Sequence, residues 1–305
     1  MDMNTEQANG KEHDVERIRS EYVKKSRMQE IWHQFKKNRG AVAGLIVFVL
    51  IIIIAIASEF IFDYNTDIAN LNAAFRLQPP SAAHPFGTDH MGRDVMARVL
   101  YGARYSLIIG IFAVLISVIF GTVIGAIAGY FGGKLETAIM RFVEIFMMVP
   151  DILLIIVIVA AFGVGIRNLI IAMGITTIPY FARNARASVM TVRDNEYVEA
   201  AKAIGTLDII IIFKHVLPNA LSPIMVQASA RMASCIVQAA TYSFLGLGVP
   251  APTPEWGAML ADARQFIREQ PHLILFPGLA IMITVLSINL IGDGLRDALD
   301  PKLKR

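Results

Sequence analysis

The chain has 305 residues, of which 55% are hydrophobic and 17% are charged, and its formal net charge is +3. Soluble domains carry about 25% charged residues, so this composition indicates that lipid replaces water around much of the surface. The single cysteine, Cys235, excludes an internal disulfide framework and a multi-cysteine metal site. It falls in an apolar stretch and is interpreted as a small buried side chain.

Apolar runs predict an all-α membrane protein with six transmembrane helices, because a helix needs about 20 mostly apolar residues to cross the hydrocarbon core. The runs are 41–62, 105–133, 145–166, 168–182, 223–247 and 271–292. The fourth run gives only about 22 Å of helix, so we expect it either to continue beyond Arg183 or to be sheltered by its neighbours. Residues 1–40 are polar, and the first apolar run begins too far in and is too long for a cleaved signal.

The distribution of basic residues predicts the orientation. Of the 28 Lys and Arg residues, 20 lie in segments 1–40, 134–141, 183–221 and 294–305, and seven lie in 63–104, 248–270 and at Arg167. Cytoplasmic connections carry the excess of Lys and Arg. Both termini and the 183–221 loop are therefore expected in the cytoplasm.

This orientation gives the expected domain organisation. A cytoplasmic segment 1–40 precedes the first span (41–62), and an extracytoplasmic loop (63–104) leads to a core of five helices (105–293) and a cytoplasmic tail (294–305). Within 11–39, apolar residues at Met28, Ile31, Trp32 and Phe35 follow helical spacing, which predicts an amphipathic helix on the inner leaflet. The alternative is a solvated helix or a partly disordered tail that includes Ile18 and Tyr22.

Glycines recur in the second span, where Gly121, Gly125 and Gly129 are spaced by four after Gly110. This spacing places them on one helix face and permits another backbone to approach closely. The pattern predicts a tightly packed helical bundle.

The outer loop 63–104 contains a polar stretch at 84–94. His84, Asp89 and His90 there could indicate a metal site, but no further ligands lie nearby. Glycine turns whose Asp89, Arg93 and Asp94 pair with the backbone or with each other explain the stretch equally well.

The outer segment 247–270 contains three alternating prolines, Pro250, Pro252 and Pro254, which stiffen an extended turn. Trp256 suits the membrane–water boundary. The segment is interpreted either as a structured rim that docks a substrate-delivery protein or as a rigid re-entry turn.

The cytoplasmic stretch 196–219 is the most informative part of the chain. Residues 194–204 are expected to form a short helix with Tyr197, Ala201 and Ile204 on one face, ended by Gly205 in a left-handed conformation. Thr206 is expected to cap a second short helix that meets Pro218. Such an element could fit a groove on a soluble partner, with the Glu199 carboxylate available to a basic groove. The alternative is an ordinary surface loop.

Here the sequence resembles a known family. The triplet Glu199-Ala200-Ala201, then Gly205, then His215-Val216-Leu217-Pro218-Asn219, is similar to the signature loop of permease subunits of ABC importers. A histidine at 215, where the general pattern often has isoleucine, resembles the branch that imports dipeptides, oligopeptides and nickel. Further stretches similar to that branch are 84–94 with 102–104, 243–248 with 254–257, 277–280 and 289–301. The likeness covers nearly the whole chain from about residue 28.

The resemblance implies the type I ABC importer permease fold and a transport role. This chain would form half of a pathway with a second homologous permease subunit in the lipid bilayer of a prokaryotic cell membrane. Two ABC ATPase subunits would bind from the cytoplasm and use ATP and magnesium, and an extracytoplasmic binding protein would deliver substrate. The chain itself is expected to bind no cofactor or metal, to have no catalytic residues and no nucleic-acid partner. Peptides are the favoured substrate, with nickel chelates, glutathione or another small solute as alternatives.

By this resemblance, the candidates for contact with the ATPase are Glu196, Tyr197, Glu199, Ala200, Ala201, Gly205, His215, Leu217 and Pro218. The candidates for docking of the binding protein are Asp89, Arg93, Asp94, Pro254 and Trp256.

The motifs of other function classes are missing from the sequence. No G-x-x-x-x-G-K-[ST] phosphate loop is present, since Lys134 follows two glycines but precedes Leu135. The metalloprotease motif H-E-x-x-H and the hydrolase motif G-x-S-x-G are also absent, which argues against a membrane enzyme. An ion-coupled secondary transporter or channel is the remaining rival, with Glu144, Asp151 and Arg231 as its candidate membrane-embedded charges.

Overall fold

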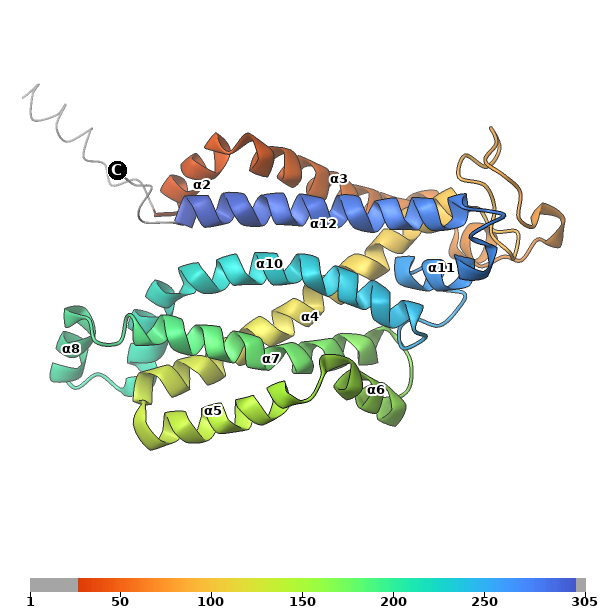
Figure 1. Cartoon of the computed structure of the whole chain (residues 1–305). Helices are drawn as coiled ribbons and strands as arrows, with labels where there is room; N and C mark the ends of the chain where they lie inside the picture. Colours follow the sequence, from red (N-terminus) through yellow and green to blue (C-terminus); the bar gives the residue numbers. More distant parts are fainter. Residues whose placement is uncertain (1–26, 300–305) are drawn as a thin grey trace, which may run out of the picture.

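The computed structural model describes residues 27–299, and within that range the chain is a bundle of helices without a named strand (Figure 1). Ile18, Tyr22 and the end of the expected tail, 300–305, lie outside the described residues. The α-helices are α2 (Arg27–Lys37), α3 (Arg39–Ile61), α4 (Val95–Phe131), α5 (Gly133–Met148), α6 (Asp151–Phe162), α7 (Ile166–Met190), α8 (Glu196–Ala203), α9 (Asp208–Ile210), α10 (Leu217–Phe244), α11 (Trp256–Ala263) and α12 (His272–Leu299). Short π or 3-10 turns are η1 (Tyr64–Ile68), η2 (Ala73–Phe75), η3 (Ile211–Val216) and η4 (Arg264–Phe266).

By length and apolar composition, four helices within the described residues can cross a membrane: Arg39–Ile61, Val95–Phe131, Asp208–Phe244 and His272–Leu299. The pair α5 and α6 adds a fifth if it is counted as one broken span. The expected count of six would also require α7, which is long enough at about 37 Å but carries too many polar residues to pass the same test.

The third expected span, 145–166, is wrong as a single helix. Helices α5 and α6 are bent by 85° relative to each other at Val149 and Pro150. Proline lacks a backbone N–H and disfavours helical geometry in the residue before it, and Val149 accordingly has the extended conformation φ −90°, ψ 126°. The segment 134–141, expected as a loop, instead belongs to α5.

The fourth expected span continues past Arg183 to Met190, as one of the two alternatives allowed. Helix α7 packs against α4 along the glycine seam predicted from the sequence. A Cβ at Gly121 would lie 2.8 Å from the Ile178 carbonyl oxygen, and one at Gly129 would lie 2.8 Å from that of Arg186. At Gly125 a Cβ would overlap the Ala182 carbonyl. Glycine is therefore required for this backbone contact, which shelters α7 between its neighbours.

The N-terminal helices lie against the last helix (Figure 1). The expected amphipathic helix is present as α2, but its apolar side chains divide between two environments. Phe35 is buried against Ala41 and Ala298, with Ile31 packed beside it. Trp32 stays half exposed, with the Lys36 ammonium 5.0 Å from its ring centroid. Part of the apolar face of α2 is therefore covered by protein and part remains free for lipid.

Candidate functional site

A helical hairpin, residues 196–216, projects from one end of the bundle and is called the α8 hairpin below (Figure 1). Its inner face is apolar: Val198, Ala201, Ile211 and Ile212 are buried in a cluster that includes Tyr130 of α4. Burying these side chains removes apolar area from water and fixes the hairpin on the ends of α4 and α7.

Polar contacts attach the α8 hairpin more firmly to the end of α4. The Tyr130 hydroxyl donates to Asp208 Oδ1 at 2.6 Å, and the Lys202 ammonium lies 5.0 Å from the centroid of the same ring. Just before the hairpin, Arg193 Nη1 donates to the Gly129 carbonyl at 2.7 Å. A displacement of the hairpin is therefore transmitted directly to α4.

The turn of the hairpin is at Gly205, as predicted. Its φ of +78° is left-handed, which glycine adopts without steric cost. Helix α8 ends there through bonds from Gly205 N to the Lys202 carbonyl (3.0 Å) and from Thr206 N to the Ala201 carbonyl (3.1 Å). This arrangement of reversed bonds around a left-handed glycine is typical of helix ends.

The second half of the hairpin differs from the expectation. Thr206 does not cap it, since Leu207 occupies the cap position and contributes no side-chain bond. Pro218 does not end it either: α9, η3 and α10 run on as one helix, Asp208–Phe244. The helix passes through Pro218 directly after the π turn η3, in which Leu217 N bonds the Ile212 carbonyl five residues back. The hairpin is thus continuous with α10.

The tip of the α8 hairpin exposes large apolar side chains. Ile204 is 82% exposed, Leu207 66% and Ile209 55%, and Phe213 and Tyr197 are also exposed. Charged residues surround them along the same short segment, among them Glu199, Lys202 and Asp208, so this end does not resemble a lipid-facing surface. Exposed apolar patches with a polar rim mark interaction surfaces.

The other ATPase-contact candidates divide between surface and interior. Glu196, Glu199, Ala200 and Pro218 are exposed and His215 is half-buried. Ala201 and Leu217 are buried in the cluster that holds the hairpin. The structure therefore brings all nine candidates to one end of the bundle.

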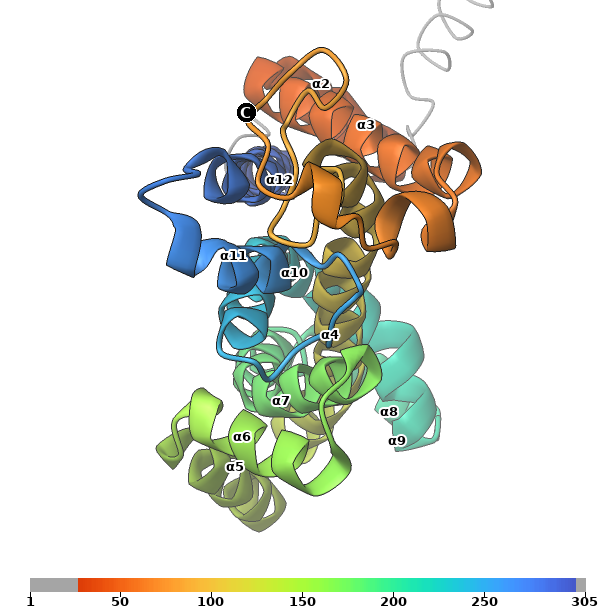
Figure 2. The ribbon, with the colours of Figure 1, turned by 90° about the vertical axis from the view of Figure 1, so that its right-hand side faces the viewer.

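The opposite end is closed by residues 63–94 and 245–271, which are expected on the outer side and are called the outer cap below; Figure 2 looks directly on them. Its buried charged groups are paired inside it. The Asp89 carboxylate accepts Arg93 Nε at 2.7 Å and lies 3.5 Å from Arg98 Nε. Arg98 in turn donates to the carbonyls of Ile68 (2.8 Å) and Pro252 (3.1 Å), so one buried guanidinium joins both parts of the cap to α4.

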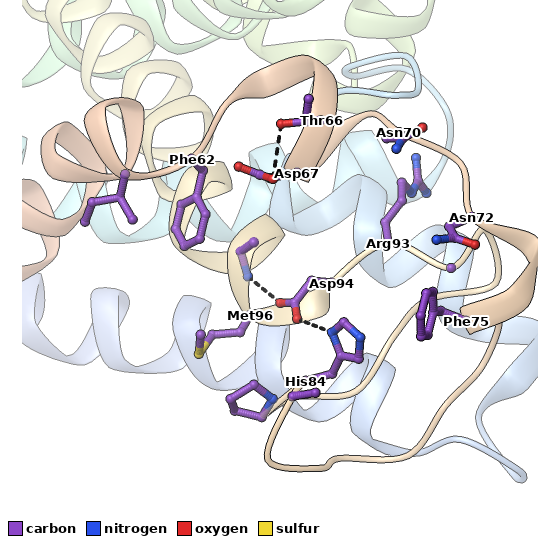
Figure 3. Close-up of a pocket in the computed structure, with 15 residues that line it drawn as sticks. Phe62, Thr66, Asp67, Asn70, Asn72, Phe75, His84, Arg93, Asp94 and Met96 are labelled. Carbon is purple, nitrogen blue, oxygen red and sulfur yellow. Dashed lines mark hydrogen bonds and ion pairs between the residues drawn. The ribbon is translucent and has the colours of Figure 1, made fainter.

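The start of α4 is fixed by a second carboxylate. Asp94 caps α4 by accepting Ala97 N at 2.8 Å, and its other oxygen contacts His84 Nδ1 at 2.8 Å (Figure 3). These two residues line an open pocket of about 580 Å³ on the outer cap.

A further carboxylate of the outer cap, Asp63, is held by backbone bonds. The N–H groups of Thr66 and Asn65 donate to it and lower the pKa of its carboxyl below the ordinary value.

Trp256 and its neighbours join the cap to the bundle. The Trp256 indole donates to the Val99 carbonyl at 2.9 Å. The fully buried Glu255 accepts Ser106 Oγ at 2.9 Å and, through its other oxygen, the Ala258 N–H at 2.9 Å as the N-cap of α11. Gly102 lies so close to the Pro254 carbonyl that a Cβ would overlap it.

The predicted docking residues of the outer cap are therefore mostly interior. Asp89, Arg93, Pro254 and Trp256 are buried, and only Asp94 reaches the surface in part. These buried residues support the exposed residues of the outer cap and are not themselves available for contact with a partner. Among residues 27–299, no three His, Cys, Asp or Glu side chains converge to hold a metal ion: His84 contacts Asp94 and His90 stacks on Phe266.

Sequence reasoning missed several residues that organise these two ends. Arg98, Ser106 and Tyr130 lie in or beside apolar runs, and their hydrogen-bond partners are 30 to 154 residues away, so no local spacing signals them. Glu255 had a usable signal: an acidic residue directly before an apolar helical run is typical of a helix N-cap.

Comparisons with known proteins agree with this architecture. The family described as "Binding-protein-dependent transport system inner membrane component" matches residues 121–305, and the "N-terminal TM domain of oligopeptide transport permease C" matches residues 26–80. The chain is 48% identical over 284 residues, 93% of each chain, to the dipeptide transport system permease protein DppC of Alkalihalophilus pseudofirmus. It is 44% identical over 279 residues, 90% of each chain, to the glutathione transport system permease protein GsiD of Escherichia coli O6:H1.

The fold is also found among solved structures. A chain of the inward-facing MetNI methionine ABC transporter superimposes with a TM-score of 0.57 at 18% identity, covering 68% of this chain and 98% of that one. That likeness concerns the fold alone. Together, the helical architecture, the projecting hairpin and the family match show that the chain belongs to the binding-protein-dependent transport system inner membrane components, the multi-pass permease subunits of ABC importers.

Proposed function

We propose that this chain forms half of the translocation pathway of an importer for di- or oligopeptides and couples it to ATP hydrolysis through the α8 hairpin. A second homologous permease subunit completes the pathway. Two ATPase subunits bind the hairpins from the cytoplasm, where both termini of this chain also lie, and consume ATP with magnesium. An extracytoplasmic binding protein delivers the peptide to the outer cap. The chain itself hydrolyses nothing, holds no cofactor and binds no nucleic acid.

The exposed apolar tip of the α8 hairpin is the observation that carries this proposal. Ile204 and Leu207 are exposed on an element whose inner face is firmly packed. A partner that covers them gains the burial free energy of both side chains. Because the hairpin is bonded to α4 and continuous with α10, movement of that partner displaces two spans together. Ligands at both ends of the bundle thereby bias a two-state switch.

The substrate class rests on the relatives. One relative is named for dipeptides and another for glutathione, and both ligands are small amides with free carboxylates. Dipeptides are placed first because the dipeptide permease has the higher identity, 48% against 44%. Glutathione is the second candidate, and nickel chelates rank lower.

The test is uptake by proteoliposomes that contain the complete importer. We expect accumulation of a labelled dipeptide only when ATP, both ATPases and the binding protein are present, with excess unlabelled glutathione competing weakly. The chain without its ATPases should be idle under an imposed proton or sodium gradient. Uptake driven by such a gradient alone would show an ion-coupled carrier instead.

A further inference from the structure

One face of α10 is polar at the depth of the membrane. The members of this face recur at helical spacing and none is fully buried in the single chain; they are Gln227, Ala230, Arg231, Ser234, Gln238 and Thr241. The exposed residues of α3, by contrast, are almost all Ile, Leu, Val and Phe. Polar side chains inside a membrane face protein or a water-filled cavity rather than lipid, so this face of α10 lines the pathway side of the subunit.

Arg231 is the charge on this face. It is the fifteenth of the 28 residues of α10, about 21 Å along the helix from its start. Its Nη2 lies 3.8 Å from Asp151 Oδ2, which is too long for a hydrogen bond, and its guanidinium carbon lies 5.4 Å from the centroid of the Tyr180 ring. Within the described residues, the buried Nε has no hydrogen-bond partner. The guanidinium therefore holds unused donors at a depth where unsatisfied donors are costly.

Asp151 is well placed to release Arg231. It is the first residue of α6, directly after the bend at Pro150, and its side chain is 46% exposed. A carboxylate at a helix N-terminus is stabilised by the helix dipole without the arginine. The Tyr180 hydroxyl bonds Gln227 instead of a charge, so it does not compete for the guanidinium.

An open cavity of about 560 Å³ lies between α10 and α12. Gln227 and Ala230 of the same face of α10 line it, together with Asn289, Asp293, Arg296 and several apolar side chains. Arg231 itself does not line this cavity, which adjoins the face on the side toward the start of α10.

We propose that Arg231 is a substrate-binding residue of the pathway, and that it exchanges the loose contact with Asp151 for the terminal carboxylate of the passing peptide. A guanidinium binds a carboxylate with two parallel N–H···O bonds, which Asp151 at 3.8 Å does not provide. The peptide satisfies the unused donors during passage, and Asp151 neutralises the arginine between passages. This inference rests on the proposed peptide substrate.

The experiment compares variants of the complete importer in proteoliposomes, using a labelled dipeptide as the free acid and as its C-terminal amide. Because the binding protein is the same in every sample, its own preference cancels in the ratio of variant to wild-type uptake for each substrate. Arg231→Gln should lower uptake of the free acid by about tenfold or more, the scale of a lost charge-assisted bond, and should change uptake of the amide much less. Arg231→Lys keeps the positive charge but cannot form the two parallel N–H···O bonds. Its uptake of the free acid should therefore lie between that of the wild type and that of Arg231→Gln.

A double variant separates substrate binding from a structural role. If the pair merely stabilises the bundle, Arg231→Gln with Asp151→Asn removes both charges and should restore uptake of the free acid. If Arg231 binds the carboxylate, the double variant stays impaired on the free acid. Arg141→Gln, which breaks the exposed pair of Arg141 with Glu144 on α5, is the control for loss of an ion pair and should leave the ratio unchanged.

Two outcomes would overturn the inference: equal loss of free acid and amide in Arg231→Gln, or recovery of free-acid uptake in the double variant. Failure of the wild-type importer to take up any dipeptide would be a separate result. It would refute the proposed peptide substrate itself, before the variants are compared.

Discussion

The α8 hairpin and the outer cap are both built from short helices and turns, and both expose some large apolar side chains, but different interactions hold them together. The hairpin places Ile204 and Leu207 in water and has its few polar bonds at its base. The cap buries Asp89, Arg98 and Glu255 and pairs each of them inside the protein. The hairpin is thus held mainly by an apolar cluster with few polar bonds, and the cap is held by buried charged groups that are paired inside the protein.

This difference bears on whether each end needs a partner to satisfy its exposed or buried groups. Buried charges that are fully paired fix one conformation and leave no unsatisfied group for a partner to complete. An exposed apolar tip loses its unfavourable contact with water only when another protein covers it. On the proposed function, the cap would offer a preformed shape to its partner, and the hairpin would form one half of an interface.

Removing Asp89 is expected to give the largest effect. Asp89→Ala leaves the Arg93 and Arg98 guanidinium groups buried without their carboxylate, and breaking such a pair costs about 3–5 kcal/mol. We expect a marked drop in the thermal unfolding temperature of the purified subunit. Glu269→Ala, which removes an exposed carboxylate from the same cap, is the control and should leave the unfolding temperature unchanged. A stable Asp89→Ala variant would show that the cap does not depend on its internal charges.

Changing the tip of the α8 hairpin should weaken binding of the ATPase subunits and leave thermal stability nearly unchanged. The pair Ile204→Ser and Leu207→Ser removes apolar contact area and should weaken ATPase binding by about 2 kcal/mol, the scale of an interface hot spot, while the unfolding temperature stays close to that of the wild type. Co-purification with the ATPase subunits measures the binding, and thermal unfolding of the purified subunit measures the stability. Leu71→Ser, at an equally exposed leucine of the outer cap, is the control and should leave ATPase binding intact.

The turn of the hairpin should respond through its backbone. Gly205→Val forces a β-branched residue into a left-handed conformation and costs about 1–2 kcal/mol. We expect uptake and peptide-stimulated ATP turnover to fall while membrane insertion survives. Gly205→Asn is the matched control, because asparagine tolerates this conformation, and should retain most activity. Normal transport by Gly205→Val would exclude a strained hinge at this position.

The smallest effect is expected at Glu199, which is exposed on α8. On the proposed function, Glu199→Lys reverses a charge at the interface with the ATPase, and exposed pairs contribute about 1 kcal/mol or less. Binding to the ATPase subunits should weaken and become less sensitive to salt, with little change in folding. A variant that lost stability and kept its affinity would place Glu199 in the fold rather than in the interface.

The sequence predicted the helical membrane fold, the glycine seam and the turn at Gly205, because each of these depends on local residue spacing. The continuous helix from Asp208 to Phe244 was not predicted, since Pro218 was taken as an interruption, whereas the helix passes through it directly after the π turn η3. The bend at Pro150 was missed because the run 145–166 is apolar on both sides of it, and the proline was not taken as an interruption there.

The position of the candidate site was predicted, and the roles of its residues stay predictions. All the loop candidates gather at one end of the bundle, but the exposed Ile204 and Leu207 extend the surface beyond the signature residues. In the outer cap, exposure could not be inferred from residue type. Pairing of Arg93 with Asp89, four residues away, agrees with one of the two interpretations of this stretch. Burial of Trp256 could not be inferred, because the Val99 carbonyl that accepts its indole N–H is 157 residues away.

The central claim is that the α8 hairpin is an inner-side surface covered by the ATPase, and cysteine labelling tests it most directly. Leu207→Cys is introduced with Cys235→Ala, so that the only thiol is at the exposed tip. A membrane-impermeant maleimide should label it only from the cytoplasmic side, and bound ATPase subunits should protect it, whereas Leu71→Cys in the same background should label only from outside. Labelling of position 207 from outside, or unchanged labelling when the ATPases are bound, would contradict the account.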